Sequence, residues 1–325
     1  MKPIQITHAY CLELKREVTI TEARREYMCL PEGTPRFRFI CSMNACWDGP
    51  LKPGVVIAGV NYDSLAEEAE KFVTAHFKRT KKGVHRVGCL WTGIEPAADV
   101  HTTDVDERAV RTARQKVTDL VTVFDPRVKR QNNHQKNPDL KESDKKTLNE
   151  NFANHASNTS RASAISGETR TSDLQRLVDS YLEAKVRLTA NEFERLPLKL
   201  VGQRRTTYKH YFSHIKSGHH TGVMYGGAVH IGDFGEGFKL RFLDLRNSLK
   251  IILYVSKTQM NAYVHAKYLR KIVDELKKTR SYVTVYALGT LLQVKHSQTQ
   301  QFELHVADLN YLALVLGANP KPNSE

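Results

Sequence analysis

Hydrophobic and polar positions alternate along much of the last third of the chain, which is the period of a strand with one buried face. The clearest run is 238–242, where Phe, Leu and Phe alternate with Lys and Arg. Similar runs predict further strands, and a run of period 3.6 between the third and fourth strands predicts a helix. The strands are expected over 222–231, 238–242, 251–255, 282–294 and 301–309, and the helix over 261–278.

Three strands, a helix and two strands is the chain order of an oligonucleotide-binding (OB) barrel. A further helix over 172–196, ended by Pro197, precedes the first strand. The pattern therefore predicts an OB-like β-barrel, with one helix between strands 3 and 4, in a domain of residues 172–316. Another small mixed barrel or sheet has a similar pattern, so the periodicity leaves that alternative open.

A polar segment separates this domain from the first part of the chain. Residues 127–171 are dominated by Asn, Ser, Lys, Thr and Glu, and such a composition cannot bury enough apolar surface to offset its ordering entropy. We expect a disordered, flexible linker there, and an α+β fold in which the two flanking domains unfold independently. The first domain is expected over 1–126 with helices at 62–75 and 103–123, and a tail over 317–325.

All five cysteines lie in the first 89 residues, and three of them form two close pairs together with a histidine. Cys41 and Cys46 make one pair, and His85 and Cys89 make the other. Two pairs of soft ligands are typical of a closed, tetrahedral site for structural Zn²⁺. We therefore expect one zinc ion on these four residues, within a zinc-ribbon-like domain. Cys29 is left open as a replacement for Cys46, and unligated thiols beside a solvated histidine are the alternative.

Four short motifs lie between Tyr27 and Trp91: Phe39-Ile40-Cys41, Val60-Asn61-Tyr62, the run from Ala75 to Arg79, and His85-x3-Cys89. On these motifs, the segment from Tyr27 to Trp91, about a fifth of the chain, resembles the zinc-ribbon head of CoiA-like competence proteins. It also resembles zinc-ribbon proteins of bacterial plasmids and integrative elements. The resemblance implies a bacterial protein of a mobile element or a defence system. It also implies a packing role for His76 beside the ribbon.

CoiA-like proteins carry a metal-dependent nuclease domain after this head, built around an Asp and a Glu-x-Lys motif on adjacent strands. This chain departs from that pattern. Its one match, Asp179 with Glu183 and Lys185, falls in a predicted helix, whereas the chemistry needs carboxylates that converge on Mg²⁺. A nuclease is therefore kept only as an alternative.

Basic residues outnumber acidic ones by 49 to 35, which gives a formal charge of +14. Most of the excess lies in residues 197–316, which hold 17 Lys and Arg against seven Asp and Glu. Such an excess attracts polyanions, and an OB-type surface binds nucleic acid with cations and with aromatic rings on which bases stack. The candidates on outward-facing strand positions are Lys239, Arg241, Tyr254, Tyr282 and Tyr286.

These features predict a zinc-containing nucleic-acid-binding protein, with single-stranded or partly opened DNA as the favoured partner. A protein-binding adaptor within a complex of a mobile element or a defence system is a second alternative. The sequence has no apolar run of eighteen residues and no signal peptide, and thiols at ligand spacing suit a reducing compartment. We therefore expect a cytoplasmic protein without a membrane partner.

Overall fold

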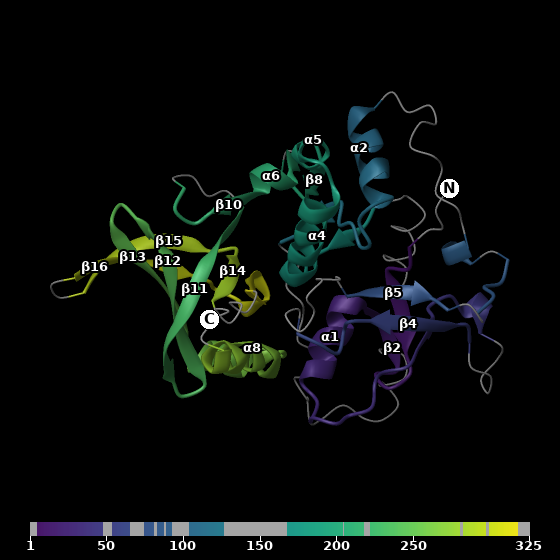
Figure 1. The fold of residues 1–325 in the computed structure, drawn as a ribbon, viewed down its shortest axis with the longest axis horizontal. Helices are drawn as coiled ribbons and strands as arrows, with labels where there is room; N and C mark the ends of the chain where they lie inside the picture. Colours follow the sequence, from purple (N-terminus) through teal and green to yellow (C-terminus); the bar gives the residue numbers. More distant parts are fainter. Residues whose placement is uncertain are drawn as a thin grey trace, which may run out of the picture.

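The computed structural model describes residues 5–47, 54–65, 75–80, 83–87, 89–92, 104–126, 168–203, 205–217, 222–279, 282–296 and 299–317. This part of the chain has a mixed α+β architecture with three sheets. Figure 1 shows the N-terminal sheet and the large C-terminal sheet at opposite ends of the view, with helix α4 between them.

The N-terminal region folds around an antiparallel sheet with the strand order β2-β1-β3-β4-β5. The strands are β1 (His8–Cys11), β2 (Arg16–Thr19), β3 (Phe39–Cys41), β4 (Val56–Val60) and β5 (His76–Arg79). Helix α1 (Ile20–Met28) begins directly after β2, because Thr19 and Glu22 form a capping box that satisfies its first backbone N–H groups. The core of this region includes the aromatic residues Phe37, Phe39, Tyr62, Phe77 and Trp91.

A middle layer combines segments from before and after residues 127–167. A small sheet of order β7-β6-β8-β9 is formed by β6 (Val123–Phe124), β7 (Arg170–Thr171), β8 (Pro197–Leu200) and β9 (Thr206–Thr207). The helices of this layer are α2 (Val105–Arg114), α4 (Leu174–Arg187), α5 (Ala190–Glu194) and α6 (Tyr208–Tyr211). They share one core, which includes Ala113, Val117, Val121, Phe124, Leu177, Tyr181 and Leu198.

This shared core corrects the predicted domain organisation. Hydrophobic residues from both sides of the expected linker pack together, so the expected boundary does not separate two independent cores. Residues 168–171 were assigned to the linker, but Arg170 and Thr171 form β7 and pair with β6. The rest of the linker, the part of the predicted 62–75 helix from 66 to 74, and the tail from 318 lie outside the described residues. The helix expected over 103–123 is the shorter α2.

The large sheet begins with an antiparallel meander of β11 (Val223–Phe234), β12 (Gly237–Arg246) and β13 (Leu249–Val255). Helices α7 (Lys257–Ala262) and α8 (Ala266–Thr279) follow, and β14 (Val283–Ala287) returns to pair antiparallel with β11. The remaining strands are β10 (Phe212–His214), β15 (Thr290–His296), β16 (Thr299–His305), which is parallel to β13, and β17 (Leu312–Leu316).

The expected barrel is not closed in the described part of the chain. The hydrogen-bonded path runs β15-β16-β13-β12-β11-β14-β17 and ends at β15 and β17. The strand predicted over 282–294 is divided into β14 and β15 at Leu288 and Gly289, and β17 was not predicted. A Cβ on Gly289 would lie 2.3 Å from the carbonyl oxygen of His305, so this close approach requires glycine. Two helices rather than one separate β13 from β14.

The two faces of the large sheet have different surroundings. One face packs against α8 through a core that includes Phe238, Leu240, Leu253, Leu269 and Ile272. The opposite face, which we call the outer face, is covered near β14 and β17 by the middle layer, where Tyr286 belongs to the same core as Tyr181 of α4. Over β12 and β13 the outer face carries exposed side chains, among them Arg241 and Tyr254.

Candidate metal centre and nucleic-acid interface

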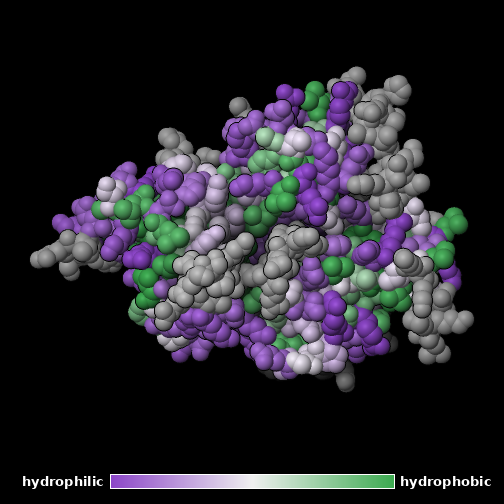
Figure 2. Space-filling model, in the orientation of Figure 1, coloured by the Kyte–Doolittle hydropathy of each residue, from purple (hydrophilic) through white to green (hydrophobic). Residues whose placement is uncertain are grey.

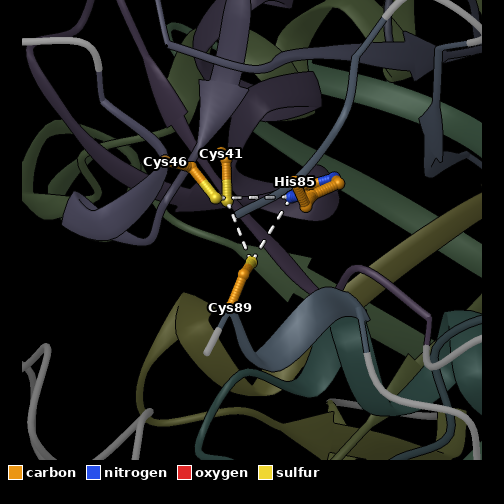
Figure 3. A group of neighbouring side chains, drawn as sticks. All are labelled: Cys41, Cys46, His85 and Cys89. Carbon is orange, nitrogen blue, oxygen red and sulfur yellow. Dashed lines mark hydrogen bonds between the residues drawn. The ribbon is translucent and has the colours of Figure 1, made fainter. Parts of the chain in front are cut away.

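Cys41, Cys46, His85 and Cys89 come together in the N-terminal region, as the spacing predicts, and could hold one metal ion. One ligand atom from each residue lies within 4.8 Å of the other three, slightly wider than the separation of about 4 Å that a loaded tetrahedral site needs. Figure 3 shows the three sulfur atoms and the imidazole pointing toward a common centre. The cysteines are free thiols, so no disulfide competes for these sulfurs.

Three of the distances within the group match the edges of a small tetrahedron. The Sγ atoms of Cys41 and Cys89 are 3.7 Å apart. Nδ1 of His85 lies 3.7 Å from Sγ of Cys46 and 3.3 Å from Sγ of Cys89. Ligands about 2.0–2.3 Å from a central zinc ion are separated by roughly 3.3–3.8 Å. The donor set therefore fits a tetrahedral ion.

Two short turns position the four ligands. Cys41 ends β3, and Cys46 ends a 3-10 turn (Asn44–Cys46) in which Cys46 N donates to Met43 O at 2.8 Å. The amide of Met43 donates to Sγ of Cys41 at 3.4 Å, an interaction that favours the thiolate. Cys89 N donates to Arg86 O at 3.1 Å in the second turn. Each turn presents one ligand pair.

The electrostatics of the group favour protonated thiols until a cation arrives. Burial raises the pKa values of Cys41 and Cys89, and the neighbouring thiols contribute to both shifts. Burial and the positive charge of Arg79 lower the pKa of His85, so its ring is neutral at pH 7. Nε2 of His85 is buried without a hydrogen-bond partner, while Nδ1 faces the sulfurs. A bound divalent cation would convert the thiols to thiolates.

Cys29 does not replace Cys46 in this group. Cys29 follows α1 and packs beside the core of the large sheet. Cys11, which the sequence leaves without a ligand partner, is buried in the N-terminal core, where its Sγ donates to Glu13 at 3.7 Å. In the ranges that the structure describes, the four-residue group is the one cluster with metal-ligand geometry.

Three of the five predicted nucleic-acid residues lie on the uncovered part of the outer face. Lys239 of β12 pairs directly with Tyr254 of β13, and Arg241 lies two residues along β12 from Lys239. Tyr254 is 49% exposed and contacts Phe234 edge-to-face, with ring centroids 5.6 Å apart. Phe234 is itself 51% exposed and belongs to the same surface. Sequence reasoning missed Phe234 because it lies in a glycine-rich run that predicts a turn.

The other two predicted residues have different surroundings. Tyr286 is 4% exposed and stacks on Tyr225 with centroids 5.7 Å apart, because the middle layer covers the outer face at β14. Its assignment as a nucleic-acid contact is therefore wrong. Tyr282 is 42% exposed and lies against Gly317 and near Gly227, which also faces Leu243 of β12.

The carboxylates of the nuclease alternative are engaged in structural contacts. Asp179 accepts hydrogen bonds from Thr21 and from Gln175, both at 3.0 Å. Glu183 accepts from the amide and the hydroxyl of Thr118, at 3.0 and 2.6 Å. Both lie on α4, and neither belongs to a metal-ligand cluster in the described ranges. The geometry of a nuclease site is therefore absent from these residues.

Comparisons with models of protein families, with curated proteins and with solved structures found no match. The resemblance to CoiA-like heads accordingly stays a prediction, and the functional argument rests on geometry. Among the described residues, no helix combines the length and the apolar character that crossing a bilayer demands.

Proposed function

We propose that this protein is a zinc-containing nucleic-acid-binding protein whose ligand is single-stranded or partly opened DNA. The observation that carries the proposal is the surface formed by the exposed Phe234, Arg241 and Tyr254 together with the half-buried Lys239, which we call the aromatic-cationic face. Figure 2 shows hydrophobic and hydrophilic side chains intermixed on the part of the molecule where Figure 1 places β12 and β13. Exposed rings beside cations suit a ligand with both π-faces and phosphates.

The strand arrangement supports an OB-like use of this sheet. In an OB fold, a partly open five-stranded barrel, strands 2 and 3 bind oligonucleotides. Here the second and third strands of the meander, β12 and β13, carry Lys239, Arg241 and Tyr254. The return of β14 to β11 and the parallel pairing of β16 with β13 fit the same proposal.

Unpaired bases are the ligand that this face suits best. A base stacks on an exposed ring only when its own face is free, and each such stack contributes about 1–3 kcal/mol. In a duplex both faces of each base are already stacked. The cations would then neutralise phosphates, which makes the affinity sensitive to salt. DNA is favoured over RNA because of the resemblance in the N-terminal segment.

The metal is proposed to be Zn²⁺ in a structural role. Three thiolates and one imidazole are a soft, tetrahedral donor set, and all four positions come from protein. No position is left for a substrate, so the ion would stabilise the fold and take no part in chemistry. Elemental analysis of the purified protein should find about one zinc per chain.

Fluorescence anisotropy with a labelled oligothymidine and with a duplex tests the proposed ligand. Phe234→Ala and Tyr254→Ala should each weaken single-strand binding roughly ten- to a hundredfold, the loss expected for one stacked base. Val186→Ala is the matched control, because Val186 is an exposed apolar residue on α4, away from the face. Absence of binding at low salt, or binding that is indifferent to salt, would refute the proposal.

A protein-binding adaptor is the second candidate, because leucines are also exposed on the large sheet. Leu243 and Leu245 of β12 and Leu292 of β15 are each about half exposed. Pull-downs from nuclease-treated and untreated lysates separate the two functions. A partner that survives nuclease treatment and is lost in Leu243→Ser would favour the adaptor.

A further inference from the structure

A third exposed aromatic ring lies on the outer face of the large sheet, beside the strand β14. Tyr282 directly precedes β14 and is 42% exposed. The next residue, Val283, belongs to the core beneath the opposite face and pairs with Ala228 of β11. Because successive side chains of a strand point to opposite sides, Tyr282 lies on the same side of the sheet as the aromatic-cationic face.

Close contact with two glycines holds this ring in place. A Cβ on Gly317 would lie 2.6–2.8 Å from three neighbouring ring atoms of Tyr282, namely Cζ, Cε1 and Cε2, so Gly317 lies over one face of the ring. The amide of Gly317 also donates to the carbonyl oxygen of Tyr282 at 2.8 Å. A Cβ on Gly227 would lie 3.5 Å from Cδ2 of Tyr282 and 3.2 Å from Cδ1 of the exposed Leu243. The ring is therefore fixed by backbone contact and still leaves much of the residue exposed.

The surface between Tyr282 and the aromatic-cationic face contains a cation. Arg241 of β12 pairs with Val229 of β11, and the preceding residue of β11 pairs with the residue after Tyr282. Arg241 and Tyr282 are therefore at the same level of the sheet, on either side of β11. Arg241 is exposed and forms no ion pair with any residue in the described part of the chain. The neighbouring pair on the outer face, Gly227 with Thr284, is uncharged.

The opposite flank of Arg241 has different residues at this level. On that side Arg241 pairs with Ile252, which is 4% exposed, and Ile252 pairs with the half-buried Glu303 of β16. Glu303 pairs in turn with Leu292 of β15, an exposed aliphatic residue. Among the described residues at this level, an exposed ring therefore lies on the β14 side of Arg241 and not on the β16 side.

We propose that Tyr282 is a second base-stacking site, and that one continuous single strand spans it and the Phe234–Tyr254 rings with a phosphate on Arg241. This inference rests on the proposed function and defines the length of its ligand. The strand order β13-β12-β11-β14 separates Tyr254 from Tyr282 by three strand spacings, about 14 Å. Two neighbouring bases of one strand cannot reach both rings. The ligand is therefore a strand of about four nucleotides or more, within the range of OB-type surfaces.

Fluorescence anisotropy with labelled oligothymidines of two lengths tests the span. Tyr282→Ala should weaken binding of a strand of about eight nucleotides roughly ten- to a hundredfold, the loss expected for one stacked base. Binding of a strand of about two nucleotides should change by less than about twofold, because it occupies one site at a time and the Phe234–Tyr254 rings remain. Leu292→Ala, on the opposite flank, is the control and should leave both affinities unchanged.

Two further variants separate stacking from packing against Gly317. Tyr282→Phe keeps the face of the ring and should restore tight binding of the longer strand. Tyr282→Leu keeps an apolar contact with Gly317 but has no ring, so it should bind the longer strand as weakly as Tyr282→Ala. If Tyr282→Ala lowers the melting temperature more than Leu292→Ala does, the Phe and Leu variants are compared in its place.

The outcomes separate this inference from the proposed function. A loss of affinity that is confined to the longer strand and restored in Tyr282→Phe supports the second stacking site. Equal losses for both lengths, or no loss for either, overturn it, and the proposed function stands if Tyr254→Ala still weakens binding. Wild-type protein that binds neither strand overturns both.

Discussion

Arg25 of α1 donates a hydrogen bond to Asp173, the N-cap residue of α4, and both side chains are buried. This ion pair joins the N-terminal sheet region to the middle layer. Close by, Thr21 of α1 donates to Asp179 of α4 at 3.0 Å. Met28 of the same helix also belongs to the core of the large sheet. The regions are therefore joined by buried polar and apolar contacts.

Removing one partner of this pair should destabilise the whole protein. Arg25→Met leaves the Asp173 carboxylate buried without its cation, which costs about 3–5 kcal/mol. Urea denaturation followed by circular dichroism measures the loss. Arg38→Gln is the control, since Arg38 pairs with Glu13 at an exposed site and its loss should cost at most about 1 kcal/mol. Equal effects of the two variants would contradict a stabilising role for the buried pair.

Loss of the metal ligands should affect more than the N-terminal sheet. Cys41→Ser or Cys89→Ser should abolish stoichiometric metal binding, which supplies on the order of 10 kcal/mol of folding free energy in zinc-finger peptides. Because α1 packs against α4 and the large sheet, we expect the melting temperature of the remaining structure to fall as well. The sequence alone predicted that two domains would unfold independently, and the contacts of α1 replace that expectation with a coupled loss of stability. Cys29→Ser, outside the group, should leave metal content and melting unchanged.

Metal affinity should rise with pH. Burial raises the pKa values of Cys41 and Cys89 in the metal-free protein, so both thiols are protonated near neutral pH. Binding must release these protons, and each one released makes the affinity about tenfold greater per pH unit below the thiol pKa. The lowered pKa of His85 means that its ring adds no proton release at neutral pH. Competition with a chromophoric chelator from about pH 6 to about pH 8 measures the slope.

The bend between β14 and β15 should depend on Gly289. A Cβ there would lie 2.3 Å from a backbone oxygen of His305, so Gly289→Ala must displace one strand of the hairpin. We expect a loss of about 1–3 kcal/mol, the usual cost of overpacking. Gly232→Ala is the control, because its added carbon would meet nothing closer than 3.6 Å. Thermal unfolding compares the two, and an equal effect would show that the bend tolerates a side chain.

Local chemistry in the sequence determined the ligand set and much of the strand pattern. Cys41 with Cys46, and His85 with Cys89, are close enough in sequence for a single turn to orient each pair. Alternation over 238–242 likewise placed Lys239 and Arg241 on the face opposite Phe238 and Leu240, because successive side chains of a strand point to opposite sides. These inferences needed no knowledge of distant residues.

Only the tertiary structure decided which faces stay exposed and which segments share a core. Alternation assigns Tyr286 to the same side as other outward residues, but it cannot show that α4 covers the sheet at β14. The same limit hid Phe234, which contacts Tyr254 of β13 across the sheet. Packing of residues 113–124 against α4 brings together segments separated by a long polar stretch. Sequence periodicity predicts on which side of its own helix or strand a side chain lies. Whether that side chain is buried depends on which other element packs against that side, and this is decided only in the tertiary structure.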